Sequence, residues 1–172
     1  MLKKLFNARL IFLLTFLPLV AFVWSIRFLG SWERAFEIGG LLSFIYIVVS
    51  LKTKQTEQSF MLAIHCFLLG GACMFLLEIG WLQYIYGYFL YATLFLWLFI
   101  VGCLQTIYSP AGFVGLHGAP RERVVRASCI LLLATFAAFL FAWKGPQSMV
   151  IVAVLPFITL NYVRVVLQKM YE

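Results

Sequence analysis

The sequence has 172 residues, of which 65% are apolar and 11% are charged, and its mean hydropathy is +1.03. Soluble domains usually carry about 25% charged residues, so this composition excludes an ordinary soluble fold, which would expose large apolar patches to water. It is the composition of a chain that resides in a lipid bilayer. The net charge of +7 comes from basic residues that separate apolar runs, so we interpret it as orientation signals and expect no direct nucleic-acid binding.

Six apolar runs have about the length that a helix needs to cross a bilayer core of about 30 Å. The first follows a basic N-terminus but is too long for the apolar part of a signal peptide, so we expect a retained span. The third and fourth come from one stretch in which Glu78 is the single charge, with a turn expected between Glu78 and Gly87. The sequence therefore predicts an all-α integral membrane protein, a single transmembrane domain built as a bundle of about six helices with short loops. The expected spans are residues 10–29, 35–51, 60–79, 86–107, 124–143 and 148–167.

The distribution of basic residues predicts the orientation of these spans. With six spans, ten of the 13 Lys and Arg residues fall on the side that holds both termini, and three fall on the other side. Cytoplasmic loops carry the excess of Lys and Arg, so we expect both termini in the cytoplasm and a multi-pass protein of a cell membrane, most simply a bacterial inner membrane. Four of the five tryptophans, Trp24, Trp32, Trp81 and Trp143, then lie near the outer ends of spans, where indole rings favour the interface.

Small residues and prolines in the spans indicate how the helices pack. Small side chains recur on one face of the third and the fifth span, and such faces let helices approach closely in lipid. Pro18 and Pro156 each lie midway along a span, where proline removes a backbone hydrogen bond and favours a kink. A path for a solute lined by these residues is the alternative interpretation. The expected packing residues are Ala63, Cys66, Gly70, Cys73, Ala134 and Ala138.

Few ionisable residues fall within the apolar runs, and those that do are candidates for function by default. Glu78 follows a long apolar stretch near the outer boundary and is the first candidate for a buried or gating carboxylate. Glu37 lies near the same boundary, one helical turn from Arg34, which favours an interfacial ion pair. His65 lies inside the third span, where the alternative to a functional role is a hydrogen-bonded packing residue.

The loop after the fourth span, residues 109–123, is rich in glycine and proline and contains His117, Arg121 and Arg123, with Arg126 just after it. Three interpretations stay open. The arginines could bind the phosphate of a lipid headgroup, since the guanidinium fork suits phosphate. The loop could dock a cytoplasmic partner. It could also be an anchoring loop whose arginines only set the topology.

Catalysis finds little support in the sequence, and we expect no catalytic residue, no metal site and no cofactor. The chain has no Asp, its Glu residues lie outside the middle of the spans, and no span places a Ser or Cys one helical turn from a His as a nucleophile with its base. The leading hypothesis is a non-enzymatic membrane subunit, a sensor or scaffold, that forms homo-oligomers or a hetero-complex with a cytoplasmic or membrane protein. The alternative is a transporter or channel component for a small solute, and a lipid-headgroup enzyme is the weaker third. In size and topology alone, the outline resembles the substrate-binding membrane subunits of modular vitamin importers.

Overall fold

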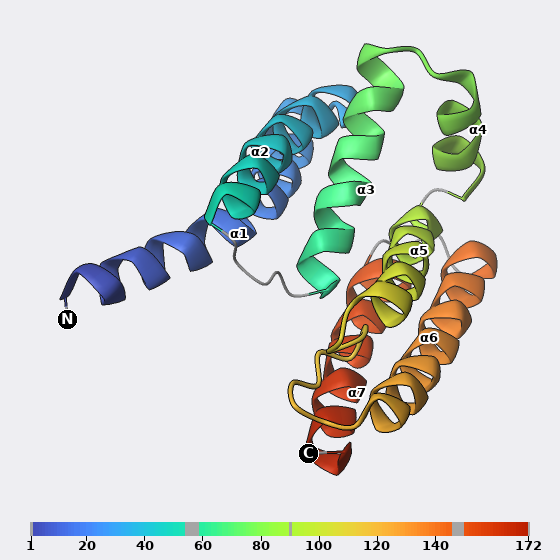
Figure 1. Ribbon diagram of the computed structural model, residues 1–172. Helices are drawn as coiled ribbons and strands as arrows, with labels where there is room; N and C mark the ends of the chain where they lie inside the picture. Colours follow the sequence, from blue (N-terminus) through green and yellow to red (C-terminus); the bar gives the residue numbers. More distant parts are fainter. Residues whose placement is uncertain (1, 54–58, 90, 146–149, 172) are drawn as a thin grey trace. The chain divides into compact units, whose positions relative to one another are not determined.

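The computed structural model describes residues 2–53, 59–89, 91–145 and 150–171, with side chains for 15–50, 60–89, 91–145 and 151–171 (Figure 1). Every regular element in these residues is helical, as the apolar runs predict. The elements are α1 Leu2–Leu29, α2 Trp32–Thr53, α3 Ser59–Leu76, α4 Gly80–Phe89, α5 Ala92–Tyr108, α6 Arg121–Lys144, the π-helix η1 Val150–Val154 and α7 Leu155–Tyr171.

The helices form two compact units, and each is described by itself. Unit 1 comprises residues 1–57 and 64–84, which include α1, α2 and most of α3. Unit 2 comprises residues 58–63 and 85–172, which include α5, α6, η1, α7 and the loop between α5 and α6.

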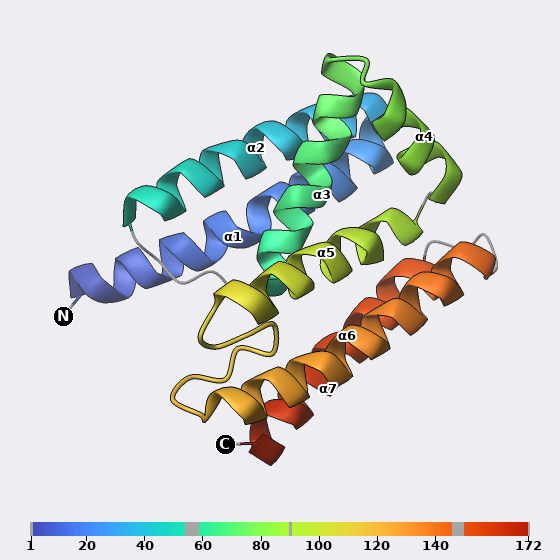
Figure 2. The ribbon, with the colours of Figure 1, turned by 45° about the vertical axis from the view of Figure 1, so that its right-hand side comes forward.

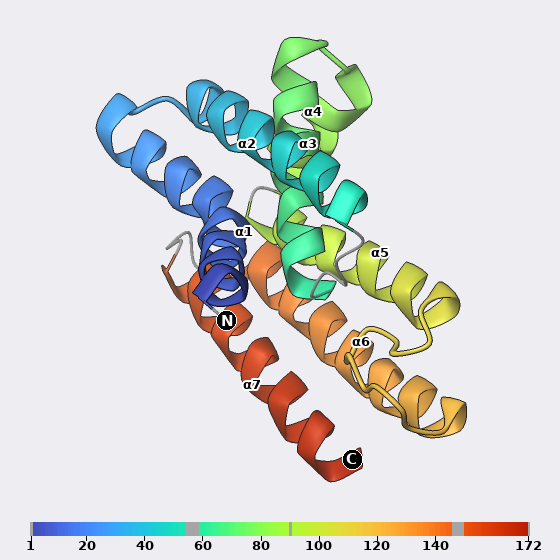
Figure 3. The same cartoon turned by 60° about the vertical axis from the view of Figure 1, so that its left-hand side comes forward.

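In unit 1, α1 and α2 form an antiparallel hairpin and α3 packs beside α2 (Figures 1 and 3). The hairpin turn follows from two residues. Gly30 ends α1 with a φ of +63°, a conformation that glycine adopts without strain. Ser31 then caps α2, because its Oγ accepts a hydrogen bond from the backbone N–H of Arg34 at 3.4 Å.

Close contact between α2 and α3 depends on glycine. A Cβ atom at Gly40 would lie 2.3 Å from the Cβ of Ala72 and 3.0 Å from the carbonyl oxygen of Leu68. At Gly71 a Cβ would lie 2.1 Å from the ring of Phe36, which is itself buried among aromatic rings of unit 1. At Gly40 the two helices therefore pack with almost no side chain between their backbones, as is typical of helices that associate in lipid, and at Gly71 the ring of Phe36 fills the space that a side chain would take.

In unit 2, α5, α6 and α7 lie side by side (Figure 2), and the loop from residue 109 to residue 120 folds back against them. The side chains of Phe113 and Val114 are fully buried, and those of Ala111 and Leu116 are nearly so. Phe113 stacks on Phe60, with ring centroids 5.3 Å apart and planes 5° apart. The loop is therefore part of the core of unit 2, which its glycines and prolines alone do not predict.

The turn expected between Glu78 and Gly87 lies at the first residue of that range. The chain turns directly after α3, where Glu78 has a φ of +50°, and α4 then runs as a helix through Gly87. The expected span 86–107 is not one helix, because α4 and α5 are bent by 114° at the break between Phe89 and Ala92. Tyr86 accepts a hydrogen bond from Trp97 Nε1 at 2.9 Å, which fixes the end of α4 against α5.

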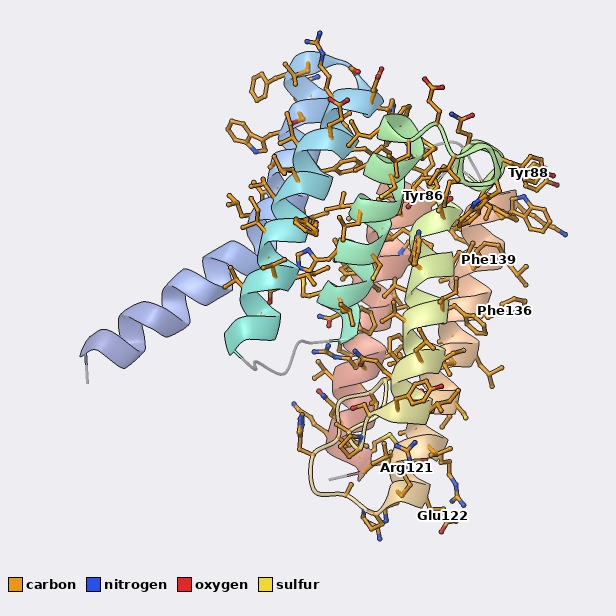
Figure 4. All side chains as sticks on the ribbon, turned by 45° about the horizontal axis from the view of Figure 1, so that its top comes forward. Tyr86, Tyr88, Arg121, Glu122, Phe136 and Phe139 are labelled. Carbon is orange, nitrogen blue, oxygen red and sulfur yellow. The ribbon has the colours of Figure 1, made fainter. Side chains whose placement is uncertain are left out.

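The two prolines within the expected spans lie in different local structures. Pro156 is in the first turn of α7, directly after the π-helical turn η1. A proline has no N–H to offer the carbonyl four residues earlier, so the wider i to i+5 pattern lets that carbonyl find the next N–H along the chain. Pro18 leaves α1 helical from Leu2 to Leu29, and the axis of α1 changes direction along its length (Figure 4).

Two described helices, residues 121–144 and 151–171, are long and apolar enough to cross a membrane. A third crossing results if α4 and α5 together form one broken span. The apolar segments Thr15–Leu29 and Phe60–Leu76 are shorter. In α2, Glu33, Arg34 and Glu37 make the N-terminal turns polar. The structure therefore shows an all-helical chain that could cross a membrane, with a count of two or three by length and composition.

Candidate functional site

His65 lies at the centre of a buried polar cluster in unit 1. It projects from α3, is fully buried, and has its Nδ1 3.2 Å from the Oγ of Ser43, which is also fully buried. The ring of Tyr46 lies over the imidazole, with centroids 4.4 Å apart and planes 30° apart. Tyr46 in turn accepts a hydrogen bond from the hydroxyl of Thr15 on α1 at 3.1 Å. The cluster thus joins all three helices of the unit through polar side chains.

The other ring nitrogen of His65, Nε2, is buried and has no hydrogen-bond partner among the described residues. A buried polar atom without a partner costs free energy and calls for an explanation, either structural or functional. Ser43 and Tyr46 share a face of α2 because they are three residues apart, and this spacing presents both to α3. Their role was not predicted from the sequence, since a serine and a tyrosine within an apolar run carry no signal of their own.

The contact between Ser43 and His65 predicts that removing one partner lowers the free energy of unfolding more than replacing both. Ser43→Ala leaves both nitrogens of a fully buried imidazole without a partner, so we expect the free energy of unfolding to fall by about 1–3 kcal/mol. The double variant Ser43→Ala/His65→Phe replaces both partners by apolar groups and should recover most of that loss. Thermal unfolding in detergent, followed by circular dichroism, measures both. Equal loss in the single and double variants would contradict the role of the pair.

Neither candidate carboxylate, Glu37 or Glu78, takes part in the hydrogen bonds of this cluster. Glu78 is exposed in the turn between α3 and α4. Glu37 is half-buried on α2, and among the described residues it forms no ion pair with Arg34, which is exposed. Among the described side chains of unit 1, the fully buried ionisable group is therefore the imidazole and not a carboxylate.

The loop of unit 2 is held by side chains from the helices around it. Ser128 of α6 is fully buried and accepts a hydrogen bond from the backbone N–H of Val114 at 3.4 Å. Gln168 of α7 donates to the carbonyl oxygens of Val114 at 2.9 Å and of Gly115 at 3.4 Å. The loop is thus fixed to residues far away in the sequence as well as by its own turns.

Arg121 holds the start of this loop. Its guanidinium donates hydrogen bonds to the carbonyl oxygens of Ser109 at 2.7 Å, of Ile107 at 3.0 Å, and of Thr106. The last carbonyls of a helix have no partners within the helix, so Arg121 caps the C-terminus of α5. Three donated bonds leave little of this guanidinium for a phosphate, which weakens the interpretation of Arg121 as a phosphate ligand.

The remaining candidates of the loop are exposed. Arg126 pairs with Glu122 one turn away at 3.1 Å. Glu122 lies in the first turn of α6, away from Phe136 and Phe139 (Figure 4). His117 is exposed and donates from Nδ1 to the carbonyl of Gly115 at 3.1 Å. Arg123 is exposed at the start of α6. The structure therefore presents exposed charged side chains on a loop whose backbone is held by side chains of α6 and α7.

The expected packing residues are distributed over several environments. Ala63 is fully buried and Ala138 is nearly so. Cys66, Gly70, Cys73 and Ala134 are half-buried. On α3 the glycines of α2 instead meet Leu68 and Ala72, and Gly71 lies against Phe36 of α2.

Aromatic side chains gather at the other end of unit 2. Tyr88 and Phe89 of α4 contact Trp143 of α6, with centroids 5.9 and 5.5 Å apart, and Phe139 continues the cluster (Figure 4). The ammonium group of Lys144 lies 5.7 Å from the Trp143 ring. Such a cluster fits the interface between lipid and water.

No group of three or more His, Cys, Asp or Glu residues that could hold a metal ion occurs in the described part of the chain. No known protein family, curated protein or solved structure matches the sequence or the fold.

Proposed function

We propose that the chain is a multi-pass membrane subunit without catalytic activity, which docks a cytoplasmic partner on the loop and first turn of α6 in unit 2. In this proposal six segments cross the membrane and both termini face the cytoplasm. The supporting observation is the construction of the loop: four of its side chains are in the core of unit 2, and Arg121, Ser128 and Gln168 bind its backbone.

A loop that serves only to carry orientation signals needs positive charge but no fixed conformation. This loop has three glycines with positive φ, Gly112, Gly115 and Gly118, and a buried aromatic ring, so its conformation is specified. Because its backbone is fixed, His117 and Arg123 are held in place and lose less conformational entropy when a partner binds. The basic character of this surface favours a partner with an acidic face.

The six-segment arrangement is supported by the charges and by the lengths of the helices together. α1 covers 28 residues and α2 covers 22, so each is long enough to cross although polar groups lie near their ends. The basic residues of the loop and of the end of α7 then share one side, which matches the excess of Lys and Arg on cytoplasmic loops.

Site-specific photo-crosslinking in intact cells tests the docking surface. A photoreactive residue at His117 or at Arg123 should give the same discrete crosslinked product, whereas one at Tyr84, an exposed residue of α4, should not give it. Arg123→Glu should reduce the His117 product by about tenfold, because a like charge then faces the acidic partner. Absence of a product at both loop positions, or an equal product at Tyr84, would reject the docking surface.

Labelling of single cysteines with an impermeant reagent tests the orientation independently. In a variant without native cysteines, Tyr84→Cys should react from outside intact cells, and His117→Cys should react only after the membrane is opened. The reverse pattern would overturn the proposed orientation, and reaction of both from outside would exclude six crossings between two cytoplasmic termini.

The buried imidazole of unit 1 supports a second candidate function, the passage of a small solute or of protons. Ionisable groups inside membrane helices commonly serve transport, and Nε2 of His65 has a free position for a hydrogen bond. In liposomes, His65→Asn should then reduce the flux of protons or of the transported solute at least tenfold. Cys129→Ala, at an exposed position of α6, should leave that flux unchanged.

A further inference from the structure

Arg164 of α7 is a cation without a counter-ion in unit 2. Among the described residues it has no ion-pair or hydrogen-bond partner, and its Nε atom is buried. The one carboxylate of α6, Glu122, pairs with Arg126 instead. A guanidinium with part of its surface withdrawn from water and no anion beside it is costly, and an anion from outside the chain would relieve that cost.

The guanidinium rests on an aromatic platform. Its Cζ atom lies 5.3 Å from the ring centroid of Phe60, a residue that is 2% exposed. Phe60 in turn stacks on Phe113 of the loop, and Phe157 packs edge-on against it at 5.8 Å. Stacking against a ring that cannot move orients the plane of the guanidinium and lowers the entropy that it loses on binding a ligand.

The two terminal nitrogens of Arg164 keep access to the surroundings, because only Nε is buried and the side chain is half-buried overall. One face of the group is therefore covered while its edge is free. A guanidinium edge presents two parallel N–H donors, the arrangement that binds phosphate or carboxylate oxygens in pairs.

The position of Arg164 along α7 decides which anion can reach it. It lies seven residues before Tyr171, the end of the helix, which is about 10 Å along the axis. A long basic side chain at that depth reaches the level of the lipid headgroups. The other basic residues of this end, including Arg123 and Lys169, raise the local concentration of anions.

We propose that Arg164, on the platform of Phe60, binds a phosphate group, either in the headgroup of an anionic phospholipid or as a free phosphate. The assignment of this end to the cytoplasmic leaflet rests on the orientation proposed above, but the binding itself does not. Gln168, one turn further along α7, is occupied by the loop carbonyls and positions α7 against the loop without contributing to the site.

The test compares the full-length wild-type chain with Arg164→Gln and Arg164→Lys in a non-ionic detergent. One arm titrates phosphatidylglycerol against a phosphatidylcholine background and measures retained lipid by native mass spectrometry. The other arm titrates inorganic phosphate by calorimetry. Lys144→Gln is the matched control, since it removes one positive charge from an exposed residue of the same unit at the other end of α6.

In whichever titration the wild-type chain binds, Arg164→Gln should weaken binding by about tenfold to a hundredfold, because it removes a charge-assisted pair of hydrogen bonds. Arg164→Lys keeps the charge but loses the two parallel N–H donors, so it should weaken binding by about threefold to tenfold. This variant replaces Arg164→Gln in the test if the Gln variant does not fold. Lys144→Gln should change binding by less than about twofold.

Binding in the lipid arm identifies a headgroup, and binding in the phosphate arm alone identifies a free anion. No saturable binding in either arm, or an equal loss in Lys144→Gln, would overturn the proposal. Crosslinking at His117 is measured separately, so a failed phosphate site with intact crosslinks rejects the site and leaves the docking surface standing.

Discussion

Gly40→Ala should lower the free energy of unfolding by about 2 kcal/mol, which is a large effect for the addition of one methyl group. The new Cβ would lie 2.3 Å from the Cβ of Ala72 and 3.0 Å from the carbonyl oxygen of Leu68, and neither atom is at the end of a flexible side chain. The helices must therefore move apart, and overpacking of this kind costs about 1–3 kcal/mol. The better helix propensity of alanine, worth about 1 kcal/mol, offsets only part of that cost.

Two variants make this prediction specific to the contact. Gly87→Ala adds the same methyl group in α4, where a Cβ would meet nothing within 4 Å, so it should leave stability unchanged or raise it by about 1 kcal/mol. Gly40→Ala/Ala72→Gly removes the closest clash and should recover at least half of the loss. Unfolding in detergent followed by circular dichroism measures all three. A Gly40→Ala variant as stable as Gly87→Ala would show that α2 and α3 do not approach closely.

Gly112→Ala should have the larger effect, about 2–5 kcal/mol, because two costs combine at this position. The φ of Gly112 is +64°, a conformation that costs alanine about 1–2 kcal/mol. In addition, the new Cβ would lie 2.6 Å from both the Oγ of Ser128 and a methyl group of Val124. Ser128 cannot move freely, since it also holds the backbone N–H of Val114.

Gly118→Ala separates the two costs. Gly118 has a φ of +80°, but a Cβ there would meet nothing within 4 Å, so only the backbone strain of about 1–2 kcal/mol remains. Limited proteolysis of the loop gives the local readout: Gly112→Ala should be cleaved within residues 109–120 much faster than wild type, and Gly118→Ala only slightly faster. Equal cleavage of both would mean that the loop does not pack against α6.

The composition and the apolar runs predicted the helical class and the approximate places of the helices. These follow from local properties, since a long apolar run without charges can satisfy its backbone in a membrane only as a helix. Pro18 and Pro156 were expected to disturb their helices, and the π-helical turn beside Pro156 is such a disturbance. Capping by Gly30 and Ser31 also agrees with simple propensity.

The arrangement of the loop and of the polar cluster could not be predicted, because both depend on contacts between distant residues. Residues 109–120 contain many turn-forming residues, and nothing local shows that Phe113 meets Phe60 or that Gln168 reaches the loop backbone. Arg121 was a candidate phosphate ligand from its residue type, whereas its partners are the carbonyls that end α5. The break between α4 and α5 was missed for the opposite reason, since the apolar pattern continues across it.

The π-helical turn η1 also marks the place where the chain can lose a residue without changing the faces that α7 presents. A π-helical turn holds one residue more than an α-helical turn, so deletion of a single residue between Val150 and Val154 should convert η1 to regular α-helix and keep α7 in register. The cost is one carbonyl group that Pro156, which has no N–H, leaves without a partner. A deletion within α7 before Arg164 removes no extra residue, so everything downstream should rotate by about 100° and shift by about 1.5 Å. Gln168 would then leave the loop carbonyls, although it had not itself been changed.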